Sequence, residues 1–312
     1  MLAVLVGPTA VGKTATAIEL AEQLSAEIVS ADSRYLYRGL DIGTAKPTPD
    51  ELARVPHHLI DVTTPDQPWS LSQYQAAAYA AIEGIRARGH LPLLVGGTGQ
   101  YVRALTEGWL LPAGDPQGDL RAELERELAE AGLEALVARL RVLDPESAAS
   151  VDLRNPRRVI RALEVVLTTG ASFAAQRRKH PPAYGSVLLG LTLPRPALYA
   201  RIDARIDAML ADGLVDEVAR LVAHGYGWEL PALSALGYRQ IGAYLRGECS
   251  LEDAVARLRR DTRQFVRRQA NWFKPADPRI HWFSARAGVA QEMATFLQVS
   301  FGPSQNAQPA VT

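Results

Sequence analysis

The stretch Gly7-Pro8-Thr9-Ala10-Val11-Gly12-Lys13-Thr14 follows an apolar run, Leu2-Ala3-Val4-Leu5-Val6, at the start of the chain. It matches G-x-x-x-x-G-K-[ST], the phosphate-binding P-loop, and a helix-forming run over 15–24 comes directly after it. Gly12 lets the backbone approach an anion, and the loop amides and the helix N-terminus favour negative charge. Lys13 supplies a cation, and the Thr14 hydroxyl can hold Mg²⁺. The sequence therefore predicts a site for a di- or triphosphate.

The surrounding sequence predicts an α/β fold. Apolar strands at 2–6, 27–30 and 91–95 alternate with helices, including one at 71–88. This alternation is typical of a P-loop NTPase-like, doubly wound parallel sheet. The fold alone does not fix the chemistry, because kinases, NTPases and some transferases share the P-loop.

From about residue 119 the sequence pattern becomes that of helices, which are expected at 120–130, 133–143 and 156–169. A strand at 186–193 then resumes the sheet, and helices are expected at 196–212, 214–224 and 251–272. We therefore predict four parts: a first part of the P-loop core (1–114), a helical insertion domain (115–182), a second part of the core with C-terminal helices (183–302) and a disordered tail (303–312).

The composition is that of an ordinary globular protein, with 47% hydrophobic and 22% charged residues. A single cysteine, Cys249, excludes a disulfide framework and a Cys-based zinc site. No run approaches the ~18 apolar residues that a membrane span needs, so we expect a cytoplasmic protein with no membrane contact. The net charge is zero, yet arginines gather at 154–161 and 257–268. Such clusters fit either a polyanionic partner or solvated helix faces.

Asp32 directly follows the second strand, at the carboxyl edge where ligands bind in such sheets. Its position leaves three roles open: an indirect Mg²⁺ ligand, a general base or a turn-capping carboxylate. The glycine-containing loops 39–47 and 96–99 either line a site or are ordinary connections. His57-His58 does not form a metal pair, because adjacent residues point apart, so a structural or hydrogen-bonding role is expected.

Two C-terminal stretches, 236–240 and 262–272, mix arginine with aromatic residues. Guanidinium groups bind phosphate and aromatic rings stack on unpaired bases, as in the recognition of single-stranded RNA loops. A long helix with Phe265 and Trp272 facing the core explains the second stretch equally well.

Several motifs follow the P-loop in a distinctive order. They are Ala31-Asp32-Ser33, Tyr37 to Pro47, Pro56-His57-His58-Leu59-Ile60-Asp61, Leu93 to Tyr101, Arg158 to Glu164, Gly237-Tyr238-Arg239-Gln240 and Thr262 to Trp272. In this combination the chain resembles the bacterial tRNA dimethylallyltransferases, the isopentenyl-tRNA transferase family, from about Ala3 to Trp282.

The resemblance implies transfer of the dimethylallyl group from dimethylallyl diphosphate to the exocyclic amine of adenosine at tRNA position 37, next to the anticodon. It implies a P-loop that binds the donor diphosphate with Mg²⁺ on Thr14, Asp32 as general base, and Thr14 and Arg205 as further catalytic residues. The insertion domain would contact the anticodon stem-loop, and the protein would be a monomer. The residues expected to face tRNA are Asp32, Ser33, Arg34, Tyr35, Thr98, Arg121, Arg157, Arg158, Val159, Ile160, Arg161, Ser234, Gly237, Tyr238, Arg239, Arg267, Arg268, Gln269 and Trp272.

The chain departs from the family pattern in two places. Arg34-Tyr35-Leu36 stands where many members have Met-Gln-Val, and one cysteine cannot form the zinc finger of eukaryotic members. Two other functions stay open: a P-loop kinase that uses ATP with Asp32 as base, and a non-catalytic RNA-binding protein. The first lacks an arginine-rich lid with kinase spacing, and intact Lys13, Thr14 and Asp32 argue against the second.

Overall fold

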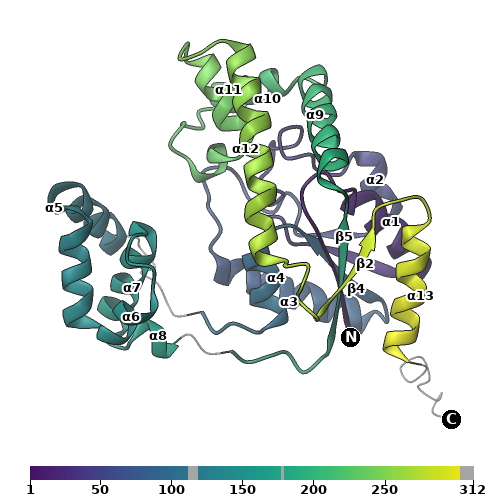
Figure 1. Ribbon diagram of the computed structural model, residues 1–312, viewed down its shortest axis with the longest axis horizontal. Helices are drawn as coiled ribbons and strands as arrows, with labels where there is room; N and C mark the ends of the chain where they lie inside the picture. Colours follow the sequence, from purple (N-terminus) through teal and green to yellow (C-terminus); the bar gives the residue numbers. More distant parts are fainter. Residues whose placement is uncertain (112–118, 177–178, 303–312) are drawn as a thin grey trace. The chain divides into compact units, whose positions relative to one another are not determined.

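The computed structural model describes residues 1–111, 119–176 and 179–302 of the 312-residue chain. It divides into two compact units, one made of Met1–Thr106 and the segment from Ala183 onward, the other of Glu107–Pro182 (Figure 1). The tail predicted to be disordered, 303–312, lies outside the described residues. Among the described helices, none has the length and apolar character required to cross a bilayer.

The first unit is built on a six-stranded parallel sheet with the order β3-β2-β4-β1-β5-β6. The strands are β1 (Leu2–Val6), β2 (Ala26–Ser30), β3 (His57–His58), β4 (Leu91–Gly96), β5 (Ser186–Thr192) and β6 (Ile280–Ser284). Every residue of β1 and β2 is buried, as expected for parallel strands covered on both faces. The predicted α/β fold with a parallel sheet is confirmed.

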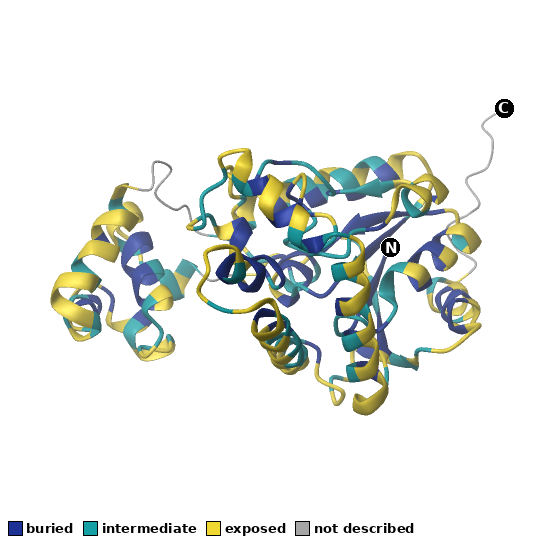
Figure 2. Cartoon of the chain, turned by 90° about the horizontal axis from the view of Figure 1, so that it is seen from above, coloured by how far each residue is buried: buried dark blue, intermediate teal, exposed yellow. Residues whose placement is uncertain are grey.

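Helices cover both faces of this sheet. They are α1 (Lys13–Leu24), α2 (Pro49–Arg54), α3 (Leu71–Ala87), α4 (Gly99–Thr106), α9 (Arg195–Ala211), α10 (Leu214–Ala223), α11 (Tyr238–Leu245), α12 (Leu251–Trp272) and α13 (Val289–Phe301), with a 3-10 turn at Pro231–Ser234. Successive side chains of β1 point to opposite faces. Leu5 joins a core with α1, α9 and α13, whereas Val4 joins a core with α3 and α4. Figure 2 shows the strands as the buried centre of the unit.

The second unit is helical, with α5 (Asp119–Leu143), α6 (Pro145–Ser150), α7 (Pro156–Thr169) and α8 (Phe173–Gln176). Gly132 (φ 80°) interrupts α5, so the two helices predicted at 120–130 and 133–143 correspond to its two halves. The unit has a small core of its own between α5 and α7, which includes Leu124, Leu136 and Leu163.

Candidate active site

The P-loop connects β1 to α1 at the carboxyl edge of the sheet. Gly7 lies against the backbone of β5, where an added Cβ would come within 2.5 Å of the Leu191 carbonyl oxygen. No larger residue fits there without moving the strand. Ala10 (φ 64°) and Gly12 (φ 106°) take left-handed conformations that curl the loop toward the start of α1. The loop therefore has the curled backbone that presents amides to an anion.

Lys13 folds back along this loop. Its Nζ donates to the carbonyl oxygens of Gly7 (3.0 Å) and Pro8 (2.8 Å). Burial lowers the pKa of Lys13 to about 8; the Asp32 carboxylate opposes this shift and the Arg205 guanidinium adds to it. Among the described residues, Lys13 has no ion-pair partner. A desolvated cation of this kind is suited to an anionic ligand, because the ligand would supply the missing counter-charge.

Two arginines of α9 reach the P-loop from the second part of the chain. Arg201 Nη1 donates to the Val11 carbonyl oxygen (3.0 Å), and Arg205 Nη1 lies 3.4 Å from Thr9 Oγ1. Arg205, which the family resemblance implies as a catalytic residue, thus lies against the P-loop.

Asp32 follows β2, and β4 separates that strand from β1 in the sheet. One carboxylate oxygen, Oδ1, accepts the Arg34 N–H at 2.9 Å. The other oxygen, Oδ2, has no hydrogen-bond donor among the described residues. The N–H of the next residue, Ser33, donates to Thr98 Oγ1 (3.1 Å), two residues after the end of β4. Asp32 therefore does cap its own turn, and the same hydrogen bond orients a second oxygen that is free to accept a proton.

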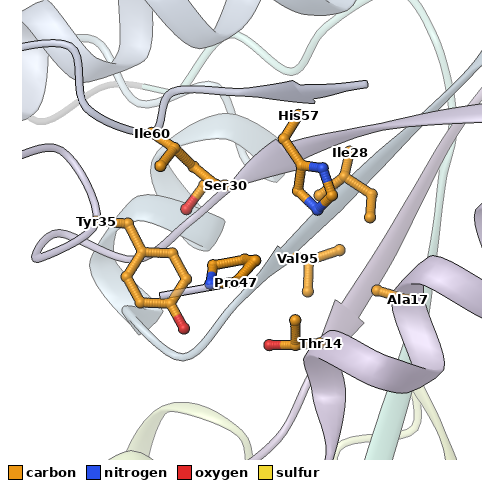
Figure 3. A pocket seen from close by; sticks show the side chains of 9 residues that line it. All are labelled: Thr14, Ala17, Ile28, Ser30, Tyr35, Pro47, His57, Ile60 and Val95. Atoms are coloured by element: carbon orange, nitrogen blue, oxygen red, sulfur yellow. The ribbon is translucent and has the colours of Figure 1, made fainter. Parts of the chain in front are cut away.

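Tyr35 connects the Asp32 loop to the glycine-containing loop 39–47, because its hydroxyl donates to the Ala45 carbonyl oxygen at 2.7 Å. Burial raises the pKa of the Tyr35 phenol. Its ring lines a cavity of about 20 Å³, with Thr14 and His57 on opposite sides (Figure 3). This volume holds about one water molecule, so the cavity in this conformation does not accommodate a five-carbon group.

The loop 39–47 is held by a buried carboxylate that the sequence analysis did not single out. Glu217 of α10 accepts the N–H groups of Asp41 (3.1 Å), Ile42 (2.7 Å) and Gly43 (3.0 Å), and the Tyr238 hydroxyl (2.6 Å). The loop is thus fixed from outside rather than being an ordinary connection. Nothing in the local sequence of α10 signals this role, since an acidic residue in a helix is normally solvated.

The expected hydrogen-bonding role of His57 and His58 is confirmed. The Nδ1 atom of His57 lies 2.8 Å from the Val55 carbonyl oxygen, and Nε2 of His58 lies 2.7 Å from a carboxylate oxygen of Glu27. Within the described ranges, no three His, Cys, Asp or Glu side chains gather in a way that could hold a metal ion.

Comparison with known proteins agrees with this geometry. A family model described as IPP transferase matches residues 35–276, and one described as isopentenyl transferase matches residues 1–64. The chain belongs to the IPP transferase family. The tRNA dimethylallyltransferase of Roseiflexus sp. (strain RS-1) is 56% identical over 293 residues, which cover 94% of this chain and 96% of that protein. A kinase and a non-catalytic RNA-binding protein are therefore set aside.

Solved structures of the family share the architecture. The full-length tRNA isopentenylpyrophosphate transferase of Bacillus halodurans is 40% identical, with a TM-score of 0.70 and 95% of each chain covered. A eukaryotic dimethylallyltransferase that acts on tRNA shares the fold, with a TM-score of 0.81 at 24% identity, over 99% of this chain and 82% of that one.

In this IPP transferase, the arginines predicted to face tRNA differ in their exposure and in their contacts. Arg157, Arg158, Arg239, Arg267 and Arg268 are exposed. Several of the predicted arginines bind carboxylates: the exposed Arg121 and the half-buried Arg161 bind Glu164, at 3.0 and 2.9 Å, and Arg239 binds Asp261 at 2.6 Å. Arg34 donates to the Pro231 carbonyl oxygen (2.7 Å) and to Ser234 Oγ (3.3 Å). Arg34 and Ser234, both predicted to face tRNA, therefore lie side by side.

Four other side chains that were predicted to face tRNA are buried. Val159 and Ile160 belong to the core of the second unit, and Tyr238 is 0% exposed beneath the loop 39–47. Gln269 is buried against the P-loop. Buried side chains maintain the fold and are not available to RNA in this conformation. The sequence placed them in motifs that also contain exposed arginines, and a motif does not separate inward from outward positions.

Trp272 and Gly237 have intermediate positions. Gly237 is buried at the start of α11. Trp272 is half-buried: its ring packs on Gly99, and the Arg103 guanidinium lies 5.4 Å from the ring centroid. The core-facing interpretation of Trp272 is thus partly correct, whereas the neighbouring Arg267 and Arg268 point to solvent.

Proposed function

We propose that this transferase moves the dimethylallyl group of dimethylallyl diphosphate to the exocyclic amine of an adenosine beside the anticodon, at position 37 of a tRNA. The observation that carries the proposal is the pairing of two chemistries at one sheet edge. A P-loop with a desolvated Lys13 suits a diphosphate, and Asp32 presents a free carboxylate oxygen close enough to affect the pKa of Lys13.

The donor half of the reaction needs charge stabilisation. As the allylic carbon–oxygen bond breaks, negative charge builds on the departing diphosphate. The P-loop amides, the Lys13 ammonium and the Arg205 guanidinium are fixed before the reaction, so they stabilise this charge without reorganising.

The residues present fit a Mg²⁺ ion that is held largely by the donor. Mg²⁺ prefers oxygen ligands and commonly binds through one or two protein oxygens together with substrate phosphates. The Thr14 hydroxyl, in the first turn of α1 directly after Lys13, is a suitable protein oxygen. Bound there, Mg²⁺ would neutralise charge on the phosphate oxygens.

The acceptor half needs a base. An adenine amine is a poor nucleophile, because its lone pair is delocalised into the ring, and it must lose a proton as the new bond forms. The Arg34 N–H fixes one oxygen of Asp32, which leaves the other oriented to take that proton. The proton then resides on Asp32, and diphosphate leaves with the electron pair of the broken bond.

The RNA would be held mainly through its phosphates. Exposed arginines occur in each unit: Arg239, Arg267 and Arg268 in the first, Arg157 and Arg158 in the second. An adenosine in a loop is weakly stacked, so turning it out costs only a few kcal/mol. We propose that the enzyme works as a monomer.

A mass-spectrometric assay tests this function. Purified protein, Mg²⁺ and dimethylallyl diphosphate are mixed with an unmodified anticodon stem-loop that carries adenosine at position 37. We expect one five-carbon unit on that adenosine, and none on a stem-loop with guanosine there. The proposal would be rejected if the protein bound the stem-loop without transferring the group, and if a separate reaction with full-length tRNA also gave no transfer.

A further inference from the structure

Gln269 has no role in the proposed reaction, yet its side-chain amide hydrogen-bonds to the P-loop and to the segment after β4. It lies in the last turn of α12, is 5% exposed and has both ends of its amide engaged. Its Oε1 accepts the Thr9 N–H of the P-loop at 2.9 Å, and its Nε2 donates to the Gly97 carbonyl oxygen at 3.1 Å. Because Thr9 N–H can only donate and a carbonyl can only accept, these partners fix the orientation of the amide.

The segment after β4 is shaped to receive this end of α12. A Cβ at Gly97 would lie 2.3 Å from Gln269 Nε2, and one at Gly99 would lie 2.2 Å from the Trp272 ring. Two glycines in the predicted turn 96–99 therefore let α12 approach the sheet edge closely. The turn 96–99 thus contacts a helix that also holds the P-loop.

The same turn of α12 carries different chemistry on its outer face. Arg267 and Arg268 are exposed, whereas Gln269 is buried. Successive residues of a helix point about 100° apart, so neighbouring positions can serve opposite surfaces. The C-terminal turns of α12 thus contact the P-loop through Gln269 and present Arg267 and Arg268 to solvent.

We propose that Gln269 is a positioning residue for the donor site: it holds the Thr9 end of the P-loop in the conformation that binds diphosphate. This rests on the proposed function for the identity of the donor. Gln269 itself touches no substrate; it removes the Thr9 N–H from the set of amides that face an anion and anchors the loop to the segment after β4.

The test replaces Gln269 with methionine, which has similar length and makes neither hydrogen bond. Diphosphate binding is measured by calorimetry with inorganic diphosphate and Mg²⁺, and KM is measured separately for dimethylallyl diphosphate and for the stem-loop. We expect the diphosphate Kd and the donor KM to rise about tenfold, as for loss of one or two buried hydrogen bonds. The stem-loop KM should stay within about twofold.

Gln264→Met is the matched control, because Gln264 is exposed on the same helix and undergoes the same chemical change. It should leave both constants unchanged. A Gln269→Met protein that folds and binds diphosphate like the wild type would overturn the positioning role. A wild-type protein that binds no diphosphate would overturn this proposal and the proposed function together.

Gln269→Glu covers the case in which the methionine variant does not fold. An ionised glutamate still accepts the Thr9 N–H but repels the Gly97 carbonyl oxygen, whereas a protonated one can make both contacts. The ratio of variant to wild-type diphosphate Kd should therefore fall as the pH is lowered. A ratio that stays constant with pH would contradict the pairing with Gly97.

Discussion

Replacing Asp32 with asparagine separates the chemistry of the site from its architecture. Asparagine keeps an oxygen where Asp32 Oδ1 accepts the Arg34 N–H, so the turn after β2 retains its capping hydrogen bond. We therefore expect the free energy of unfolding to change by no more than about 0.5 kcal/mol. The group that is lost is the proton acceptor on the second oxygen. General base catalysis contributes about 10²–10⁴-fold, so kcat should fall by that factor.

The structure adds a second signature to this variant. The negative charge of Asp32 raises the pKa of Lys13 against the stronger lowering effect of burial. Without that charge, Lys13 should lose its proton at a lower pH, so the alkaline decline of kcat/KM should begin below pH 8 in Asp32→Asn. This shift reports the charge of Asp32 beside Lys13, whereas the fall in kcat reports its role as base.

The assay is single-turnover formation of N6-dimethylallyladenosine by mass spectrometry, from pH 6 to 10, alongside stem-loop binding. Asp66→Asn, at an exposed aspartate in the turn after Thr64, is the matched control and should behave as wild type. Turnover of Asp32→Asn within tenfold of wild type would refute the assignment of Asp32 as base, and an unchanged alkaline limb would refute its electrostatic coupling to Lys13.

Three further perturbations follow from the same contacts. Wild-type kcat/KM for the donor should decline as the pH rises through about 8, because neutral Lys13 no longer pairs with diphosphate. Lys13→Met should lower kcat/KM for the donor about 10²-fold or more, and the decline with pH should disappear. Hydrogen bonds from Arg88, His58 and His90 lower the pKa of Glu27 from 4.5 to about 2, so its ionised form stabilises the fold above pH 4.5. Glu27→Gln should lose about 3 kcal/mol at pH 7 in urea unfolding, and the gap to wild type should close as the pH falls from 4.5 toward 2. Glu217→Ala should cost about 3 kcal/mol in the same assay, since it leaves buried amides unpaired, whereas the exposed neighbour Asp216→Ala should cost under about 0.5 kcal/mol.

Local features of this chain were predictable because their physical causes are local. The P-loop is a strand, a turn and a helix start within a few residues, and Asp32 follows a buried strand, so both were assigned to the sheet edge from sequence. The helix at α12 was predicted with its observed bounds, 251–272, because its apolar residues recur at helical spacing.

The missed elements lack such a local cause. Strand β6 (Ile280–Ser284) is the edge strand of the sheet and mixes buried, half-buried and exposed residues, so neither alternation nor an apolar run marks it. Its pairing with β5, about ninety residues earlier, is what makes it a strand. Helix α13 then packs on α1, which again is a contact between distant parts of the chain.

The same reasoning explains why the arginine-rich helix could not be assigned from sequence. Two interpretations of residues 262–272, one facing RNA and one facing the core, were equally good, and the structure shows both exposed arginines (Arg267, Arg268) and buried or half-buried residues (Gln269, Trp272) in this stretch. What separates them is the position of Gln269, whose partner Thr9 lies 260 residues away and leaves no trace in the surrounding sequence. The P-loop is recognisable from eight residues, yet Arg205 and Gln269 hold its Thr9 from the other half of the chain. A motif match therefore predicts what binds, whereas the conformation that sets how tightly it binds is decided by the tertiary fold.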